Sequence, residues 1–154
     1  MKDKILVVKV GTQVLTQEDG LLDLGVLQNL IRQIFQLRTN GYKVILVSSG
    51  AVGAGRSLIL NYQHTKTLAA IGQLKLLQTY NQIAKSYDLI LGQLLVTKED
   101  FKDRNHYLNI RDTTLEMLRQ GILPIANEND VISSPEIFFT DNDELAGLLA
   151  TMVG

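Results

Sequence analysis

The residues whose types and spacing best suit chemistry form a glycine-rich turn after an apolar stretch. In Lys43–Arg56, which reads KVILVSSGAVGAGR, an apolar run ends at two serines and is followed by Gly50, Gly53 and Gly55. A strand, a glycine-rich turn and a helix start together present several backbone N–H groups to an anion. The segment therefore predicts binding of a phosphate or a carboxylate. The alternative is that these glycines only let the helix pack close to the strand.

A second turn of this kind lies upstream and carries a positive charge. Lys9 interrupts the apolar stretch Ile5–Val10, which runs into Gly11 and Thr12. An ammonium group is costly to bury without a partner, so Lys9 is expected to face something negative. The alternative is a lysine whose side chain extends from the strand end into water. Two anion-facing turns near one lysine predict chemistry on a phosphate or a carboxylate.

The spacing of the first turn also resembles a nucleotide-binding P-loop, but imperfectly. Gly50, Gly55, Arg56 and Ser57 approach the pattern G-x-x-x-x-G-K-S/T, with arginine in place of the lysine that reaches the β- and γ-phosphates. No aspartate convincingly ends a later strand, and G-x-x-G-x-G is not the glycine order of a dinucleotide fold. A P-loop is therefore the less favoured interpretation.

Acidic and carboxamide residues gather at two further points. Asn127–Asp130 directly follows an apolar stretch, and the segment Asp141–Asp143 precedes an apolar segment with helical character. Taken alone, the first suits a solvated turn and the second a helix cap. Their aspartates could bind a metal ion, but the spacing is weak evidence and no metal ligand is predicted. His64 and His106 are the only histidines and lie in no motif, which disfavours a histidine-dependent hydrolase.

Hydrophobic patterning places these residues on alternating strands and helices. The expected strands are Ile5–Val10, Val44–Val47, Leu89–Val96 and Ile122–Ala126, with a short fifth one suggested at Ile137–Phe139. The expected helices are Leu24–Thr39, Lys66–Tyr87, Asn109–Gln120 and, capped by Asp141, Asn142–Met152. In the second helix the predicted core positions are Leu68, Ile71, Leu74, Leu77 and Ile83. Pro124 indicates either an edge strand or a strand end.

This alternation predicts an α/β fold with a parallel sheet covered on both faces, because the strands are continuous apolar runs. Ligands of such folds bind at the carboxyl ends of the strands. The polar clusters follow strands at these ends, namely Gly11-Thr12, Ser48–Gly55, Thr97–Asp100 and Asn127–Asp130. We therefore expect them to share one edge of the sheet.

Length and composition limit the classes of function. The 154 residues suit one domain, and 45% hydrophobic and 20% charged residues are ordinary for a soluble globular protein. A net charge of −1 offers no basic field for nucleic acid or an anionic membrane surface. The absence of cysteine excludes disulfides and thiolate chemistry. The apolar start is too short for a signal peptide, and no stretch approaches the roughly 20 residues of a membrane span. A cytoplasmic location is expected.

Six segments, in order, resemble those of the glutamate 5-kinases within the amino acid kinase family. They are VVKVGTQVL (Val7–Leu15), VSSGAVGAGR (Val47–Arg56), AAIGQ (Ala69–Gln73), NIRDT (Asn109–Thr113), PIANENDVI (Pro124–Ile132) and TDNDELA (Thr140–Ala146). The first two mark the whole family, and the closer assignment rests on the Ile-Gly-Gln, Asn-Glu-Asn-Asp and Asp-Asn-Asp segments. The resemblance spans nearly the whole chain. It implies a three-layer αβα sandwich with a mostly parallel open sheet, similar to carbamate kinase and apparently truncated.

The resemblance implies ATP-dependent phosphorylation of the side-chain carboxylate of L-glutamate to L-glutamyl 5-phosphate, the first step of proline biosynthesis. It implies ATP and Mg²⁺ as cofactors, free proline as a feedback inhibitor, and a homo-oligomer, dimer or tetramer, in which Lys66–Tyr87 is a candidate interface. No nucleic acid or membrane partner is implied. One alternative is a sister kinase acting on acetylglutamate, aspartate, carbamate or a nucleoside monophosphate. Another is a non-catalytic fragment that binds glutamate or proline.

The resemblance also assigns roles to individual residues. Lys9 would contact ATP phosphate and stabilise the transferring group, and Asp143 would orient the catalytic lysines. Backbone amides near the reacting groups would come from Gly11 and Gly50. The residues that would hold glutamate are Ser49, Asp130 and Asn142. The ATP-binding C-terminal part of the kinase domain is not found within residues 1–154, so the chain is expected to be the glutamate-binding N-terminal part, as a fragment or as a naturally short form.

Overall fold

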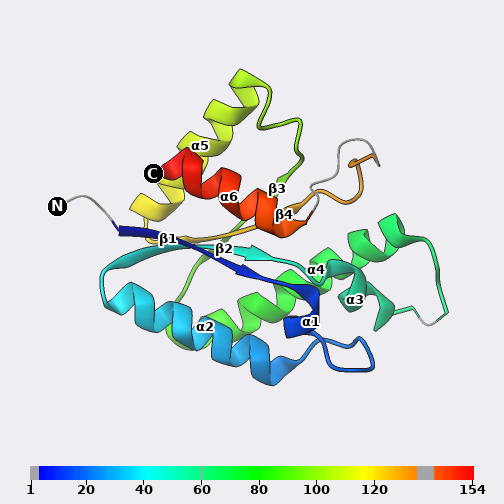
Figure 1. The fold of residues 1–154 in the computed structure, drawn as a ribbon. Helices are drawn as coiled ribbons and strands as arrows, with labels where there is room; N and C mark the ends of the chain where they lie inside the picture. Colours follow the sequence, from blue (N-terminus) through cyan, green and yellow to red (C-terminus); the bar gives the residue numbers. More distant parts are fainter. Residues whose placement is uncertain (1–3, 60, 135–140) are drawn as a thin grey trace.

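An open parallel sheet organises the chain, of which a computed structural model describes residues 4–59, 61–134 and 141–154 (Figure 1). The elements are β1 (Lys4–Val10), α1 (Thr12–Leu15), α2 (Leu24–Thr39), β2 (Tyr42–Ser48), α3 (Ala51–Arg56), α4 (Thr65–Ala84), the 3-10 helix η1 (Lys85–Tyr87), β3 (Leu91–Val96), α5 (Arg104–Arg119), β4 (Leu123–Glu128) and α6 (Asn142–Val153). Within the described residues the strands form one sheet in the order β1-β2-β4-β3, with every pair parallel. The predicted α/β fold with a parallel open sheet is confirmed.

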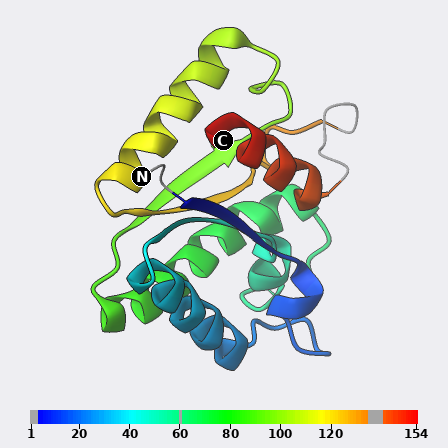
Figure 2. The same ribbon diagram turned by 60° about the vertical axis from the view of Figure 1, so that its left-hand side comes forward.

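Helices cover both faces of the sheet, as Figures 1 and 2 show from two directions. The helices α2 and α4 lie on one face, and α5 and α6 lie on the other. Alternation along β2 divides the core accordingly, because Val44 and Leu46 pack on the α2–α4 side while Ile45 and Val47 pack on the α5–α6 side. Burial on both faces explains why the strands are continuous apolar runs.

Local capping signals set the helix boundaries. The helix α2 spans the predicted residues because the Asp23 side chain accepts a hydrogen bond from the backbone N–H of Val26, and Gly41 follows the helix at a φ of +84°. The prediction for α5 started too late. This helix begins at Arg104, because the Asp103 side chain accepts a hydrogen bond from the backbone N–H of His106 at 2.9 Å. The first residues of α5 are polar, so hydrophobic spacing carried no signal there.

One expectation about burial is wrong, and one of the two alternatives for Pro124 is excluded. Leu74 is 62% exposed, whereas Leu76 and Tyr80 on the same helix are fully buried. Pro124 does not mark an edge strand, because β4 lies between β2 and β3. It is the second residue of β4 and precedes Ile125, where pairing with β2 begins, so it marks a strand end. The short helix α1 was not predicted, and the strand suggested at Ile137–Phe139 lies outside the described residues.

Two glycines let α3 and α4 approach more closely than any side chain would allow. A Cβ atom on Gly72 would overlap the backbone carbonyl oxygen of Ala51, and one on Gly55 would overlap the carbonyl of Leu68. Gly55 thus serves helix packing, which leaves the P-loop interpretation without support. Gly50 has a different task, because its φ of +102° turns the chain from β2 into α3 and favours glycine.

Candidate active site

A cavity opens at the carboxyl ends of β1, β2 and β4, where the polar residues were expected to gather. Its volume is about 400 Å³, which is within the range of small-molecule sites. Its lining comprises Lys9, Gly11, Thr12, Ser49, Gly50, Ala51, Val52, Asn127, Glu128, Asp130, Asp141 and Asn142. Carboxylates and an ammonium group in one lining suit a ligand that carries charges of both signs.

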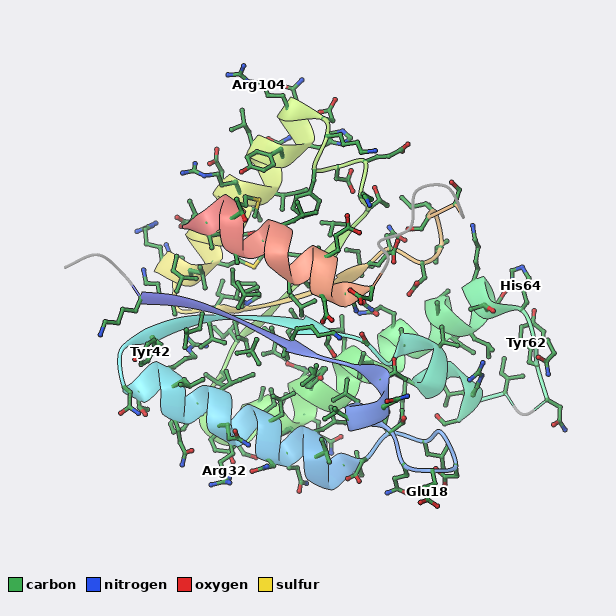
Figure 3. All side chains as sticks on the ribbon, viewed as in Figure 1. Glu18, Arg32, Tyr42, Tyr62, His64 and Arg104 are labelled. Carbon is green, nitrogen blue, oxygen red and sulfur yellow. The ribbon has the colours of Figure 1, made fainter. Side chains whose placement is uncertain are left out.

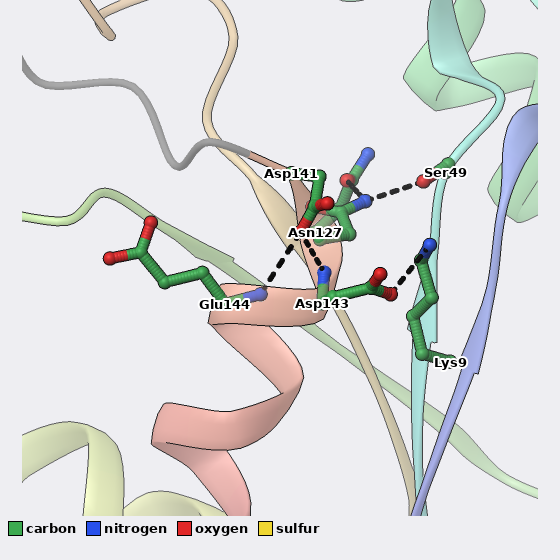
Figure 4. A network of polar contacts seen from close by, with 7 residues as sticks. Lys9, Ser49, Asn127, Asp141, Asp143 and Glu144 are labelled. Atoms are coloured by element: carbon green, nitrogen blue, oxygen red, sulfur yellow. Dashed lines mark hydrogen bonds and ion pairs between the residues drawn. The ribbon is translucent and has the colours of Figure 1, made fainter.

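Lys9 reaches the cavity because of the alternation along β1. Ile5 and Val7 pack into the core beneath α5 and α6, so Lys9, two positions further on, faces α6 as well. Its Nζ lies 2.7 Å from Oδ1 of Asp143, and Figure 4 shows this ion pair. The Lys9 and Asp143 side chains are 27% and 66% exposed. An ion pair this close to solvent contributes little to stability, so Lys9 can exchange Asp143 for an incoming anion.

The N-terminus of α6 supplies Asp143 and its neighbour Asn142. Asp141 caps this helix as predicted, because its Oδ1 accepts hydrogen bonds from the backbone N–H groups of Asp143 at 2.8 Å and Glu144 at 3.2 Å (Figure 4). The cap fixes the first turn of α6 beside the strand ends. The helix dipole adds positive potential at the same place, which favours a negatively charged ligand group there.

A network of hydrogen bonds joins Ser49, Asn142 and Asn127. Asn142 donates through Nδ2 to Ser49 Oγ at 2.7 Å and to Asn127 Oδ1 at 3.1 Å. Asn127 Oδ1 also accepts from the backbone N–H of Glu128 at 2.9 Å. Asn127 is buried, and its Nδ2 donates to Oε1 of Gln73 on α4 at 2.9 Å. Ser49 and Asn142, which were both predicted to hold glutamate, are therefore linked directly.

Next to Ser49, a buried hydroxyl pair connects the end of β2 to α4. Ser48 Oγ and Tyr80 Oη lie 2.8 Å apart, and both residues are fully buried. Burial raises the pKa of Tyr80 to about 12, so its phenol stays neutral. Ser48 also donates to the backbone carbonyl of Ser49 at 3.1 Å. The helix α4 therefore supports both the Ser49 segment and Asn127 from below the cavity.

Asp130 is the cavity residue with a marked electrostatic perturbation. Burial, and then the charge of nearby Glu128, raise the pKa of Asp130 to about 6. A carboxylate in this position is stabilised by a cation, and a ligand ammonium group would supply one. Binding of such a ligand would lower the pKa of Asp130 again.

The structure brings the predicted site residues together, and their roles stay predictions. The cavity is lined by Lys9, Gly11, Ser49, Gly50, Asp130 and Asn142. Asp143 reaches the cavity through its ion pair with Lys9. Sequence reasoning missed the contributions of Asn127 and Gln73, because Asn127 was treated as part of a turn although it lies within β4. Both residues lie in segments on which the family resemblance rests, and this resemblance was the signal that could have identified them.

The two histidines lie outside the lining of the cavity. His64 caps α4 beside Tyr62 at the periphery of the molecule (Figure 3), where its Nδ1 accepts from the backbone N–H of Thr67 at 3.2 Å. His106 Nδ1 lies 2.9 Å from Oδ1 of Asp100. Across the described ranges, no group of three or more His, Cys, Asp or Glu side chains is placed to hold a metal ion. In the same part of the chain, no helix has the length and apolar character needed to cross a membrane.

Several known proteins are similar to this chain. The amino acid kinase family model matches residues 4–154. Proteins named glutamate 5-kinase from Chlorobaculum tepidum and Bacteroides thetaiotaomicron are 47% and 44% identical, each over 96% of this chain and 43% of the relative. That of Haemophilus influenzae strain KW20 is 40% identical over 99% of this chain and 43% of its own length. The chain therefore spans less than half the length of the curated relatives it matches.

A solved structure supports the same fold. Giardia carbamate kinase has a TM-score of 0.60 and 17% identity, over 99% of this chain and 70% of its own. At this identity the likeness concerns the fold alone. The family model, in contrast, accounts for all of the sequence from residue 4 onward. The chain belongs to the amino acid kinase family.

Proposed function

We propose that this chain is the glutamate-binding part of an ATP-dependent kinase that acts on the side-chain carboxylate of L-glutamate. The product is L-glutamyl 5-phosphate, and the reaction is the first, cytoplasmic step of proline biosynthesis. One observation carries the proposal: Lys9, paired with Asp143 at 2.7 Å, lines the same cavity as Ser49 and Asn142. The similarity to proteins named glutamate 5-kinase supports the choice of substrate.

The reaction needs no general base. A glutamate side chain has a pKa of about 4.3, so it is already ionised at neutral pH. One carboxylate oxygen attacks the γ-phosphorus of ATP and forms a new P–O bond, while the bond to the β-phosphate oxygen breaks and ADP leaves with the electron pair. Because both reactants are anions, catalysis consists of positioning and charge stabilisation. The Lys9 ammonium and the amides of Gly11 and Gly50 would supply that stabilisation.

Mg²⁺ belongs to this proposal as a counter-ion that neutralises charge on the ATP phosphates. Mg²⁺ commonly binds through one or two carboxylates together with substrate phosphates and water. The acidic lining of the cavity is compatible with that mode, and a protein cage of three or more metal ligands is absent from the described residues. We assign no residue of this chain as a Mg²⁺ ligand.

Asp130 favours an acceptor with a free amino group. Its carboxylate, beside Glu128, would pair with the ammonium of L-glutamate, whereas the amide nitrogen of acetylglutamate carries no charge. The secondary ammonium of proline would suit the same carboxylate, which supports proline as a competing inhibitor. Asp130 therefore supports glutamate over acetylglutamate as the acceptor.

The test is ADP release by the complete gene product that contains this chain, measured with L-glutamate, acetylglutamate and L-aspartate. L-Glutamate is expected to give the highest kcat/KM, and isothermal titration is expected to show that proline competes with it. Tight binding and turnover of another acid, with none of glutamate, would refute the substrate assignment. The 154-residue chain by itself is expected to bind glutamate without turnover, and ATP hydrolysis by that chain would contradict its assignment as the acceptor part.

A homo-oligomer is the remaining part of this proposal. Leu74 and Leu95, which are 62% and 39% exposed, line a partly apolar groove between α4 and β3. Exposed apolar side chains of this kind favour contact with another protein surface. Light scattering of the complete gene product tests the assembly, and a monomer at all concentrations would contradict it.

A further inference from the structure

The carboxamide network sets the direction of the hydrogen bonds around the cavity. A carboxamide accepts only through its oxygen and donates only through its nitrogen. Gln73 Oε1 accepts from Asn127 Nδ2 at 2.9 Å, so Asn127 turns its Oδ1 the other way, toward Asn142. Asn142 must then present Nδ2, which donates to Asn127 and to Ser49. The acceptor of Gln73 on α4 and the backbone N–H of Glu128, which donates to Asn127 Oδ1 at 2.9 Å, therefore favour the same orientation of Asn127 and, through it, of Asn142.

The consequence is a defined polarity at the cavity. Both hydrogens of Asn142 Nδ2 are used within the protein, so Asn142 can offer a ligand only the acceptor Oδ1. Ser49 Oγ accepts from Asn142, and its hydroxyl hydrogen donates to no group in the described part of the chain. Ser49 therefore offers a donor. A donor beside an acceptor matches a carboxylate beside an ammonium, as in a free amino acid.

The surroundings of Gln73 favour the observed orientation. A groove next to the cavity is lined by Gln73 together with Glu128 and Asp130. Carboxylates attract the nitrogen of a carboxamide and repel its oxygen. Gln73 is thereby biased to keep Nε2 near the acidic groove and Oε1 toward Asn127.

We infer that Gln73 is a positioning residue, which favours an α-ammonium group by holding, together with the backbone N–H of Glu128, the polarity of Asn127 and through it that of Asn142 and Ser49. Gln73 is absent from the lining of the cavity itself and acts through Asn127. The inference rests on the proposed function, since the amino acid it selects is the glutamate of that proposal. It concerns specificity, and it assigns Gln73 no part in phosphoryl transfer.

The experiment compares Gln73→Met with Gln73→Glu in the complete gene product. Methionine has a similar length but offers no strong acceptor, whereas glutamate keeps an acceptor oxygen in either protonation state. The control is Gln78→Met, the same change at an exposed position of α4. The readouts are KM for L-glutamate, KM for ATP, kcat, the melting temperature, and the ratio of kcat/KM for L-glutamate to that for glutarate, which lacks the ammonium.

Gln73→Met is expected to raise KM for L-glutamate about tenfold and to lower the preference for L-glutamate over glutarate by a similar factor, a size typical of one lost polar contact. KM for ATP should stay unchanged, and Gln73→Glu should keep both glutamate parameters within about threefold of the unaltered protein.

Equal losses in Gln73→Met and Gln73→Glu, or an unchanged preference in Gln73→Met, would overturn the inference. If Gln73→Met does not fold, Gln73→Leu, which also removes the acceptor, takes its place in the comparison with Gln73→Glu. Failure of the unaltered protein to use glutamate would instead refute the proposed function, and the inference with it.

Discussion

The two faces of the sheet meet the cavity with different chemistry. On the α4 face the supporting groups are neutral and largely buried: Gln73 with Asn127, and Tyr80 with Ser48. On the α6 face they are charged and closer to solvent. Lys9 pairs there with Asp143, and Lys98 pairs with Glu144 at 2.6 Å, with both of the latter side chains 31% exposed.

This contrast indicates a division of labour. Neutral hydrogen bonds can be buried without the large desolvation penalty of ions, and they fix geometry well. Exposed ion pairs contribute little to stability and exchange partners readily. The α4 face is therefore suited to hold the acceptor in place. In the proposed reaction, the α6 face would meet the charge of ATP and the charge that develops during transfer.

The largest effect is expected from removing the charge at Lys9. Lys9→Ala should lower kcat at least about 100-fold, because it deletes the charge that, in the proposed reaction, would stabilise the transferring group. The melting temperature should change by no more than about 2 °C, since the ion pair is exposed. ADP release and thermal unfolding by circular dichroism give the two values. Lys98→Ala, which also breaks an ion pair to α6, is the control and should retain activity, and retention of activity within a few-fold by Lys9→Ala would refute its role.

The next effect should be on stability and concerns the α4 face. Gly72→Ala places a methyl group against the backbone carbonyl of Ala51 and is expected to lower the free energy of unfolding by about 3 kcal/mol. The control is Gly147→Ala in α6, where an added Cβ has no neighbour within 4 Å and should raise stability by about 0.5–1 kcal/mol. Urea denaturation measures both. Equal responses at the two positions would show that the close approach of α3 and α4 is not needed.

The proposed role of Asp130 predicts that ligand binding depends on pH. With a pKa of about 6 in the free protein, the carboxylate is mostly protonated at pH 5.5. KM for L-glutamate should therefore rise about fourfold between pH 7.5 and 5.5. Asp130→Asn should bind glutamate more weakly at pH 7.5 and lose this dependence. A pH dependence of KM that persists in Asp130→Asn would assign it to another group.

Asp130 is also expected to lower the stability of the ligand-free protein at neutral pH. The folded pKa of Asp130 lies above its unfolded value, so the folded state binds the proton more tightly. The free energy of unfolding contributed by this group falls as pH rises from about 4 to about 6, and the deficit persists above that. Asp130→Asn should thus stabilise the free protein at pH 7 by about 1 kcal/mol, after allowance for solvent screening. Thermal unfolding at pH 4 and pH 7 measures the change, and equal stabilisation at both values would contradict this account.

The smallest effect is expected at Tyr80. Tyr80→Phe removes the hydroxyl that meets Ser48 and should lower the free energy of unfolding by about 1 kcal/mol. KM for glutamate should rise only slightly, because Ser49 keeps its bond from Asn142. A loss of kcat comparable to that of Lys9→Ala would contradict the separation between the two faces.

The sequence predicted the fold and singled out Lys9 on the charged face, because the relevant signals are local, whereas the pair of Lys98 and Glu144 was not predicted. Continuous apolar strands indicated a sheet covered on both faces, and Asp141 indicated the start of α6 as a helix cap. Lys9 stood out because a charge in an apolar strand needs an explanation. These inferences required no knowledge of long-range contacts.

The neutral face was largely hidden for the opposite reason. Gln73 and Asn127 are 54 residues apart and meet only through the packing of α4 on the sheet. A glutamine within a helix carries no mark of the contact that its acceptor will make, and an asparagine at a strand end resembles a turn residue. Gly72 was likewise uninformative until its contact with Ala51 was known.

The central claim is that L-glutamate binds at the carboxyl edge of the sheet, between the neutral and the charged face. A titration of the ¹⁵N-labelled complete gene product with L-glutamate, followed by NMR, tests this directly. We predict saturable shifts of the backbone signals of Ser49 and Asp130 and of the Asn142 side-chain amide. Signals of Arg38 and Gly121, which line a pocket with the first residues of β2, should stay unchanged. No saturable shift, or shifts confined to that opposite end, would contradict the account.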